Sequence, residues 1–212
     1  MNGNGEQAVR MPYRIETERL SLRCWDPVNA RVLREALDAC DQHLRPWIPF
    51  MKDEPRTLEQ TADWLRGHRA NFDLDLHFRY AVWDRGGGGL LGENMLLKRV
   101  GPAALEIGYW THESAVGRGI ASEATCAMIR VAFEIARVER VEIQCAPGNE
   151  ASAAIPEKLG FTHEATLKER APDTEGGVHD LMIWSLFAAD YPGSPATGLE
   201  LKAFDGAGLQ VL

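Results

Sequence analysis

The stretch Leu105–Glu123, LEIGYWTHESAVGRGIASE, decides how this chain is organised. It opens with an apolar run that predicts a strand carrying one carboxylate, Glu106. A polar turn and Gly117-Arg118-Gly119 follow, and then a pattern typical of a long helix. A strand that leads through glycines into a helix gathers backbone N–H groups at a point where the helix dipole is positive. The stretch therefore predicts an anion site, to which Arg118 can add a full charge.

The glycines alone do not identify the anion. The dinucleotide fingerprint needs a third glycine, and Ser122 occupies that position. The phosphate loop that ends in Gly-Lys-Ser or Gly-Lys-Thr is absent as well. A plain turn would also explain a lone Gly-x-Gly, so it is the position between a strand and a helix that favours a ligand site.

Further motifs lie before and after this loop in a fixed order, and that order resembles the GNAT-type acyl-CoA N-acyltransferases. It resembles more closely the subgroup of ribosomal-protein alanine N-acetyltransferases. The similarity runs from about Glu16 to Tyr191 and implies that the glycine loop binds the pyrophosphate of acetyl-CoA. The motifs are LRPWIPF (Leu44–Phe50), EIGYW (Glu106–Trp110), GRGIASEA (Gly117–Ala124), NEAS (Asn149–Ser152) and EKLGF (Glu157–Phe161).

The resemblance implies a GNAT fold of the α/β (α+β) class. In this fold, helices flank a central, twisted, mixed and mostly antiparallel sheet, whose central strands splay apart to admit acetyl-CoA. Residues 15–191 are predicted to form the single N-acetyltransferase domain. Residues 1–14 are predicted to be a flexible segment. Residues 192–212 are predicted to form a Pro/Gly linker and a C-terminal hairpin, with its turn at Asp205-Gly206.

Local patterns predict the individual elements. Asp26-Pro27 and the capping box that begins at Thr57 each predict the start of a helix. Another helix should leave the glycine loop, and a short one should run from Asn149 or Glu150 to Leu159, with Gly160 as its left-handed cap. The predicted strands cover residues 19–25, 78–83, 90–98, 105–110, 141–145, 161–170 and 178–187.

Composition limits the class of protein. The chain has 212 residues, of which 45 % are hydrophobic and 25 % charged, as in soluble globular domains. It has no apolar run of membrane-spanning length, and its N-terminus lacks an apolar signal region, so we expect no membrane partner and a cytoplasmic location. The formal net charge of −8 argues against direct nucleic-acid binding and is compatible with a cationic amine. The four cysteines and six histidines lack metal-ligand spacing, so we predict reduced thiols and no metal.

The resemblance assigns acetyl-CoA binding to the loop and its neighbours. Main-chain amides of the loop and Arg118 hold the pyrophosphate, and amides near the end of the central strand stabilise the thioester oxygen. Val116 stands where the family usually has glutamine or arginine, so the loop must rely more on its amides. The predicted cofactor-binding residues are Trp110, Thr111, Val116, Gly117, Arg118, Gly119, Ile120, Ala121, Asn149 and Ser152.

Glu106 is the predicted catalytic base or amine-binding group. A carboxylate in an apolar strand is costly unless it is paired or functional. Alternation places Glu106 and Gly108 on one face, where glycine would leave room for a ligand. The alternative is an ion pair, for example with Arg99, that plays no part in catalysis.

Ser152 is the predicted donor to the departing thiolate. Many GNAT enzymes place a tyrosine seven residues after the asparagine, and here Pro156 occupies that position. The ribosomal-protein subgroup uses a serine three residues after the asparagine, which Asn149 and Ser152 match. The alternative is that Asn149 caps a helix and Ser152 only faces inward, and both descriptions can hold together.

Two aromatic residues and one cysteine have competing interpretations. Trp47 and Phe50 are candidates for the acceptor pocket, and an aromatic core role is equally compatible with the sequence. Cys145 ends a strand next to the expected thioester, so an acyl-cysteine route is conceivable. Because no basic neighbour in sequence would make it a thiolate, a small buried apolar role is favoured.

The sequence thus predicts an acetyl-CoA-dependent N-acetyltransferase that acts by direct attack of a primary amine. A protein N-terminal α-amine is the favoured acceptor, because roughly a tenth of an α-amine is neutral at pH 7 and well under a thousandth of a lysine amine is. The alternatives are a small-molecule amine, such as an antibiotic or a polyamine, and a CoA-binding protein without turnover. A homodimer is left open.

Overall fold

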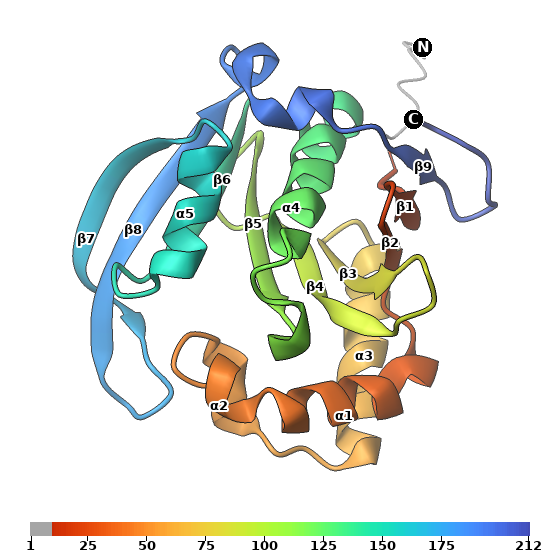
Figure 1. Cartoon of the computed structure of the whole chain (residues 1–212), viewed down its shortest axis with the longest axis vertical. Helices are drawn as coiled ribbons and strands as arrows, with labels where there is room; N and C mark the ends of the chain where they lie inside the picture. The colour runs from red at the N-terminus through yellow and green to blue at the C-terminus, as the bar shows by residue number, and fades with distance from the viewer. Residues whose placement is uncertain (1–9) are drawn as a thin grey trace, which may run out of the picture.

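A nine-stranded sheet runs through the computed structural model, which describes residues 10–212 (Figure 1). The strand order is β7-β8-β6-β5-β4-β3-β2-β1-β9. Only β5 and β6 pair in parallel among these described strands, so the predicted mixed, mostly antiparallel sheet is confirmed. The strands are β1 (Arg14–Glu16), β2 (Leu20–Cys24), β3 (His77–Asp84), β4 (Leu90–Leu97), β5 (Ala104–Thr111), β6 (Arg140–Cys145), β7 (Thr162–Pro172), β8 (Val178–Phe187) and β9 (Lys202–Phe204).

The parallel pair is short, and this creates an opening in the middle of the sheet. Strands β5 and β6 share three rungs, of which Glu106 and Glu142 form the last. Beyond that rung β5 continues to Thr111 along β4, and β6 continues to Cys145 along β8. We call the opening between these two strand ends the fork. The predicted splay of the central strands is therefore confirmed.

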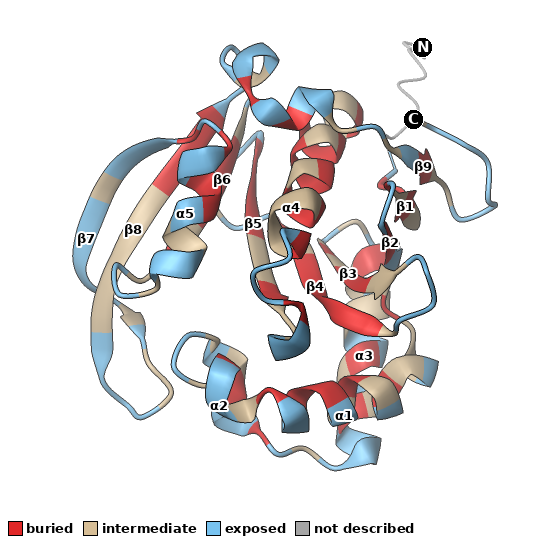
Figure 2. Cartoon of the chain, viewed as in Figure 1, coloured by how far each residue is buried: buried red, intermediate tan, exposed pale blue. Residues whose placement is uncertain are grey.

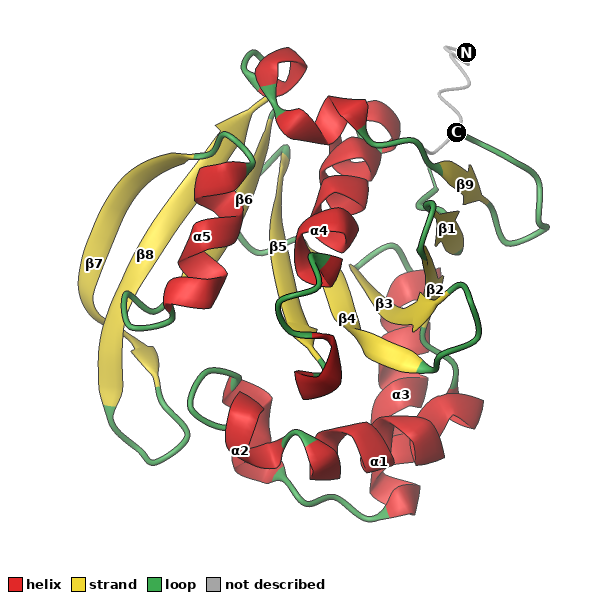
Figure 3. Cartoon of the chain, in the orientation of Figure 1, coloured by secondary structure: helices red, strands yellow, loops and turns green. Residues whose placement is uncertain are grey.

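Helices cover both faces of the sheet, as Figure 3 shows by element type. Helices α4 and α5 lie on one face, which we call the loop face because the glycine loop leads into α4. Helices α1, α2 and α3 lie over the other face, which we call the opposite face. The helices are α1 (Ala30–Ala39), α2 (Asp41–Leu44), α3 (Leu58–Asp73), α4 (Ile120–Arg130) and α5 (Glu150–Lys158).

Strand β5 is buried from both sides, because successive side chains of a strand point to opposite faces. Leu105 and Ile107 join the core cluster that contains α4. Trp110 joins a second cluster with side chains of α1 and α3. Figure 2 shows buried residues along α4 and the neighbouring strands on one side, and along α1 on the other. The two clusters hold the strand that the sequence placed at the centre of the fold.

The helix boundaries follow the predicted capping residues. The side chain of Asp26 accepts a hydrogen bond from the backbone N–H of Val28. Thr57 and Gln60 form the reciprocal bonds of a capping box at the start of α3. Gly160 has a φ of +82° after α5, a conformation that costs glycine little. These three predictions are confirmed.

Both described ends of the chain add to the same edge of the sheet. Met11 is buried, β1 begins at Arg14, and β9 pairs with β1. The tail turns back at Asp205, whose N–H donates to the carbonyl of Leu209 at 2.9 Å. Residues 1–9 of the predicted flexible segment lie outside the described residues. Across residues 10–212, no helix is both long and apolar enough to cross a membrane.

Candidate active site

The glycine loop ends at the N-terminus of α4. Gly117 and Gly119 have φ values of +75° and +74°, and the loop can turn into the helix because glycine adopts these angles without strain. Gly119 is the N-cap, and the first amides of the helix have no carbonyl partner within the helix. Val116 and Arg118 are exposed beside them. The loop therefore gathers exposed backbone N–H groups and one guanidinium, a combination that suits an anion.

Residues from the turn between β1 and β2 hold this loop in place. Arg19 Nη1 donates to the carbonyl of Arg118 at 3.0 Å, and Arg19 Nε donates to Glu123 Oε2 at 2.6 Å. The hydroxyl of Thr17 also bonds Glu123. Sequence reasoning missed this anchor, because Arg19 lies about a hundred residues before the loop.

The backbone of β5 presents unpaired amides to the fork. The N–H of His112 donates to the carbonyl of Leu91 at 2.8 Å, which fixes the alternation along the strand. It follows that the amide of Trp110 points to β4, and that the amides of Tyr109 and Thr111 point into the fork. Of the two amides expected near the thioester, Thr111 is correctly oriented. Trp110 instead packs its indole in the second core cluster.

Tyr109 connects the two sides of the fork on the loop face. Its hydroxyl donates to the carbonyl of Ser152 at 3.0 Å and lies 3.2 Å from Ser152 Oγ. The N–H of Ser152 donates to Asn149 Oδ1 at 3.1 Å, so Asn149 is the predicted helix cap. Proline stands at position 156, where many GNAT enzymes have a tyrosine, and the structure brings a different phenol, that of Tyr109, from β5.

Burial makes the two ionisable side chains on this side of the fork, Tyr109 and Cys145, weaker acids. It raises the pKa of Tyr109 well above the usual value, although the bond to Ser152 opposes the shift. It also raises the pKa of the Cys145 thiol, again with Ser152 opposing. Cys145 is therefore a thiol at neutral pH, which favours the small buried role over an acyl-cysteine route.

Glu106 lies on the opposite face at the last rung before the fork. It is 4 % exposed, and its two oxygens accept from Arg99 Nε at 2.6 Å and Nη2 at 2.5 Å. The expected alternation is confirmed, but the expected space beside Gly108 is not. A Cβ at Gly108 would lie 3.0 Å from Met95 Cγ, because the side chain of Met95 already fills that position.

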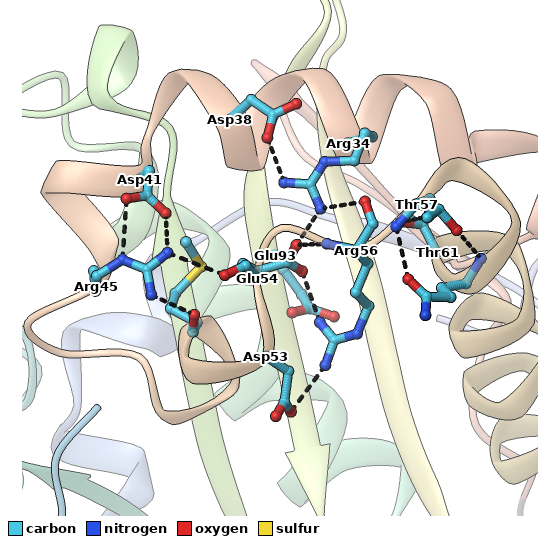
Figure 4. A network of polar contacts seen from close by, with 12 residues as sticks. Arg34, Asp38, Asp41, Arg45, Asp53, Glu54, Arg56, Thr57, Thr61 and Glu93 are labelled. Atoms are coloured by element: carbon cyan, nitrogen blue, oxygen red, sulfur yellow. Dashed lines mark hydrogen bonds and ion pairs between the residues drawn. The ribbon is translucent and has the colours of Figure 1, made fainter. Parts of the chain in front are cut away.

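The segment after α2 approaches the loop that follows β6. Figure 4 shows how Glu54 and its two arginine partners, Arg34 and Arg56, hold this segment. Trp47 is 40 % exposed, and its ring would lie 3.7 Å from a Cβ at Gly148, in the loop before α5.

A second contact joins the end of α2 to the hairpin between β7 and β8. The hydroxyl of Thr174, in the hairpin between β7 and β8, donates to the carbonyl of Arg45 at 2.9 Å. Phe50 instead packs against Trp64, with ring centroids 5.0 Å apart, and belongs to the second core cluster. Of the two aromatic candidates, Trp47 is the one that approaches the loop after β6.

The fork therefore brings together most of the predicted site residues. The glycine loop and Ser152 lie on the loop face, the Thr111 amide points into the fork, and Glu106 lies on the opposite face. Glu142 also lies on the opposite face, and the sequence analysis missed it. Its signal was present as a carboxylate in the alternating run Val141–Cys145. Among residues 10–212, no group of three or more histidine, cysteine, aspartate or glutamate side chains is arranged to hold a metal ion.

Comparison with known proteins identifies the family. The family model described as an acetyltransferase (GNAT) domain matches residues 19–162. The chain belongs to the GNAT acetyltransferases. It is therefore an acetyl-CoA-dependent acetyltransferase, and the family predicted from the sequence is confirmed.

Two relatives of this GNAT acetyltransferase come from Bacillus. YdaF of Bacillus subtilis (strain 168), whose name proposes a ribosomal N-acetyltransferase, is 32 % identical over 83 % of this chain and 95 % of its own length. The N-acetyltransferase p20 of Bacillus licheniformis, named as uncharacterised, is 31 % identical over 84 % of this chain and 98 % of its own.

Solved structures share the fold. RimJ of Mycobacterium smegmatis, in complex with a CoA disulfide, superposes with a TM-score of 0.76 at 24 % identity, covering 88 % of this chain and 92 % of RimJ. RimL, a ribosomal L7/L12 alpha-N-protein acetyltransferase in complex with coenzyme A, has a TM-score of 0.74 at 22 % identity, covering 81 % of this chain and 95 % of RimL.

Proposed function

We propose that this acetyltransferase transfers the acetyl group of acetyl-CoA to the α-amine at the N-terminus of a protein. The observation that carries the proposal is the fork, where the glycine loop and a buried carboxylate approach one opening from the two faces of the sheet. The name of YdaF supports a ribosomal protein as the acceptor.

On the loop face, the chain supplies groups for holding the cosubstrate. The helix amides after Gly119 and the side chain of Arg118 suit the pyrophosphate. Val116 offers no polar side chain, so the amides carry more of this binding. The Thr111 amide suits the thioester oxygen. Asn149 orients the first turn of α5 so that Ser152 can donate a hydrogen bond to the departing thiolate.

On the opposite face, the chain supplies groups for the amine. Glu106 either takes the amine proton or orients the amine, and Arg99 holds its carboxylate in place. Trp47 lies beside Gly148, just after β6, and suits contact with the acceptor. A protein α-amine fits a site with a modest base, because a much larger share of it is neutral at pH 7 than of a lysine amine.

A thiol-release assay tests the proposal. The enzyme is given acetyl-CoA with ribosomal-protein N-terminal peptides, the same peptides with blocked α-amines, polyamines and aminoglycosides. We expect CoA release with free α-amine peptides only. Release with polyamines or aminoglycosides alone would assign a small-molecule acceptor. Tight acetyl-CoA binding without release for any amine would identify a CoA-binding protein and overturn the proposal.

The location of the cosubstrate has its own test. Gly119→Val should abolish acetyl-CoA binding, because the side chain obstructs the loop where the pyrophosphate must approach. Gly87→Val is the matched control, since Gly87 has a φ of +92° in a turn far from the loop in sequence and carries similar backbone strain. Calorimetry that showed equal affinity for the two variants would move the binding site elsewhere.

A further inference from the structure

We infer that Glu142, on β6, is the catalytic base of this reaction and that Glu106 orients the acceptor amine. The inference rests on the proposed function and assigns the proton transfer within that site. It begins from the register of the parallel pair, in which Glu142 stands directly opposite Glu106 on the last rung before the fork.

The two carboxylates share a face of the sheet. Residues directly opposite on neighbouring strands point the same way. Val141, Ile143 and Cys145 belong to the core on the loop face, so Glu142 points to the opposite face, as Glu106 does. Glu142 is 6 % exposed and Glu106 is 4 % exposed. A nitrogen that approaches the fork from this face therefore meets both carboxylates.

The partners of the two carboxylates differ. Both oxygens of Glu106 accept short, charge-assisted bonds from the same guanidinium. Glu142 Oε1 accepts from the neutral amide of Gln144 at 2.6 Å. For Glu142 Oε2, the nearest cationic donor among residues 10–212 is Arg140 Nη2 at 3.4 Å. That same Nη2 donates to the carbonyl of Val100 at 2.7 Å, so Oε2 is the least engaged carboxylate oxygen at the fork.

A base must have a lone pair available for the proton it removes, and a carboxylate held by two short bonds to arginine has little left. We therefore assign Glu142 Oε2 as the atom that accepts the proton of the amine. The other charged groups around it are Arg99 with Glu106 on the β5 side, Arg140 on its own strand, and Glu164, which accepts from Ser185 at 2.6 Å.

The reaction forms one C–N bond and breaks one C–S bond. The neutral amine attacks the thioester carbon and forms the C–N bond, which leaves the nitrogen positively charged and acidic. That nitrogen gives one proton to Glu142, and the C–S bond breaks with its electron pair on the sulfur. The thiolate leaves with a hydrogen bond from Ser152, and Glu142 loses its proton to solvent before the next cycle.

Steady-state kinetics of Glu142→Gln and Glu106→Gln test this assignment, because both substitutions keep shape and remove basicity. Glu142→Gln should lower kcat about 10²-fold with unchanged acetyl-CoA affinity by calorimetry. Glu106→Gln should mainly raise KM for the acceptor peptide. For Glu142→Ala, formate should restore part of the lost rate, because a small carboxylate can occupy the vacated space. A role of Glu142 in folding alone would give no such rescue.

Two outcomes would overturn the inference. If Glu142→Gln keeps the wild-type kcat and Glu106→Gln loses it, Glu106 is the base and the proposed function stands. If the wild-type enzyme releases no CoA with any peptide, the proposed function fails and takes this assignment with it. Thermal unfolding of each variant shows whether a lost rate reflects a lost fold.

Discussion

Glu93 and Glu106 are buried carboxylates on neighbouring strands, and both face the side of the sheet that α1 and α3 cover. Glu93 accepts hydrogen bonds from two nitrogens of Arg79, at 2.8 and 2.7 Å, and from two tryptophan indoles. Among residues 10–212, only Arg99 donates a side-chain hydrogen bond to Glu106. One carboxylate has its bonding capacity filled by core residues, and the other has a single partner at the edge of an opening.

The two carboxylates also differ in how exposed their arginine partners are. The side chain of Arg79 is 14 % exposed, and that of Arg99 is 60 % exposed. Burial pushes the pKa of Glu93 upward, but Arg79 more than offsets this, so the pKa lies below its usual value. Glu93 is thus an anionic centre of the core. Water can take the place of Glu106 around Arg99, so the core does not depend on Glu106 as a counter-ion.

Glu93→Gln should have the largest effect on folding. It leaves the guanidinium of Arg79 buried without a counter-ion, and breaking a buried pair in this way costs about 3–5 kcal/mol. Urea unfolding at pH 7 measures the loss. A loss below about 1 kcal/mol would show that the cluster does not hold the core together.

Ser152→Ala should lower the catalytic rate and leave the stability unchanged, whereas Glu93→Gln lowers the stability. A positioned donor contributes about 10²-fold or more to the rate, and the bond from Tyr109 to the Ser152 carbonyl survives the substitution. We expect kcat to fall by about 10²-fold, with acetyl-CoA affinity and the free energy of unfolding nearly unchanged. An unchanged kcat would leave Ser152 with its inward-facing, structural role alone.

His68→Gln tests the polar cluster around Glu93 through its pH dependence. His68 stacks edge-on to Trp64 at 4.7 Å, and burial, with Arg79, lowers its pKa from 6.5 to about 3. The folded protein thus keeps His68 neutral where the unfolded chain binds a proton. The stability from this neutral histidine is complete above pH 6.5 and is lost progressively as pH falls toward 3.

The wild type should therefore lose about 1.4 kcal/mol of unfolding free energy per pH unit more than the variant across that window. At pH 5 the excess loss should reach about 2 kcal/mol. Urea titrations of both proteins at pH 7, 6 and 5 give the slopes. Parallel slopes would mean that His68 is solvated or protonated in the folded state.

Local pattern was enough to predict strands β2 to β8, the helix starts and the face of Glu106, because alternation and capping involve residues close in sequence. It did not predict the short edge strand β1. It could not show that Met95 fills the space beside Gly108, since that contact depends on the register between β4 and β5. Nor could it show that Glu142 stands opposite Glu106, because the two strands are joined through the whole of α4.

The contact between Tyr109 and Ser152 depends on the relative positions of β5, β6 and α5, which are far apart in sequence. It needs β5 to diverge from β6 by the amount that brings α5 within reach of a phenol. The same divergence decides which amides of β5 remain unpaired. Sequence motifs therefore gave the candidate residues, and the pairing of the strands decided which of them face one another.

Glu106→Gln is the matched partner of Glu93→Gln, and it should have a much smaller effect on folding. The glutamine keeps a carbonyl that can accept from Arg99, and it removes a charge that was costly to bury. The Arg99 side chain is 60 % exposed, so water can solvate its charge, and such pairs contribute about 1 kcal/mol or less. Urea unfolding of both variants at pH 7 should show a difference of about 2 kcal/mol or more between them. Equal losses would place Glu106 among the groups that hold the core, and the contrast between the two carboxylates would then no longer separate folding from function.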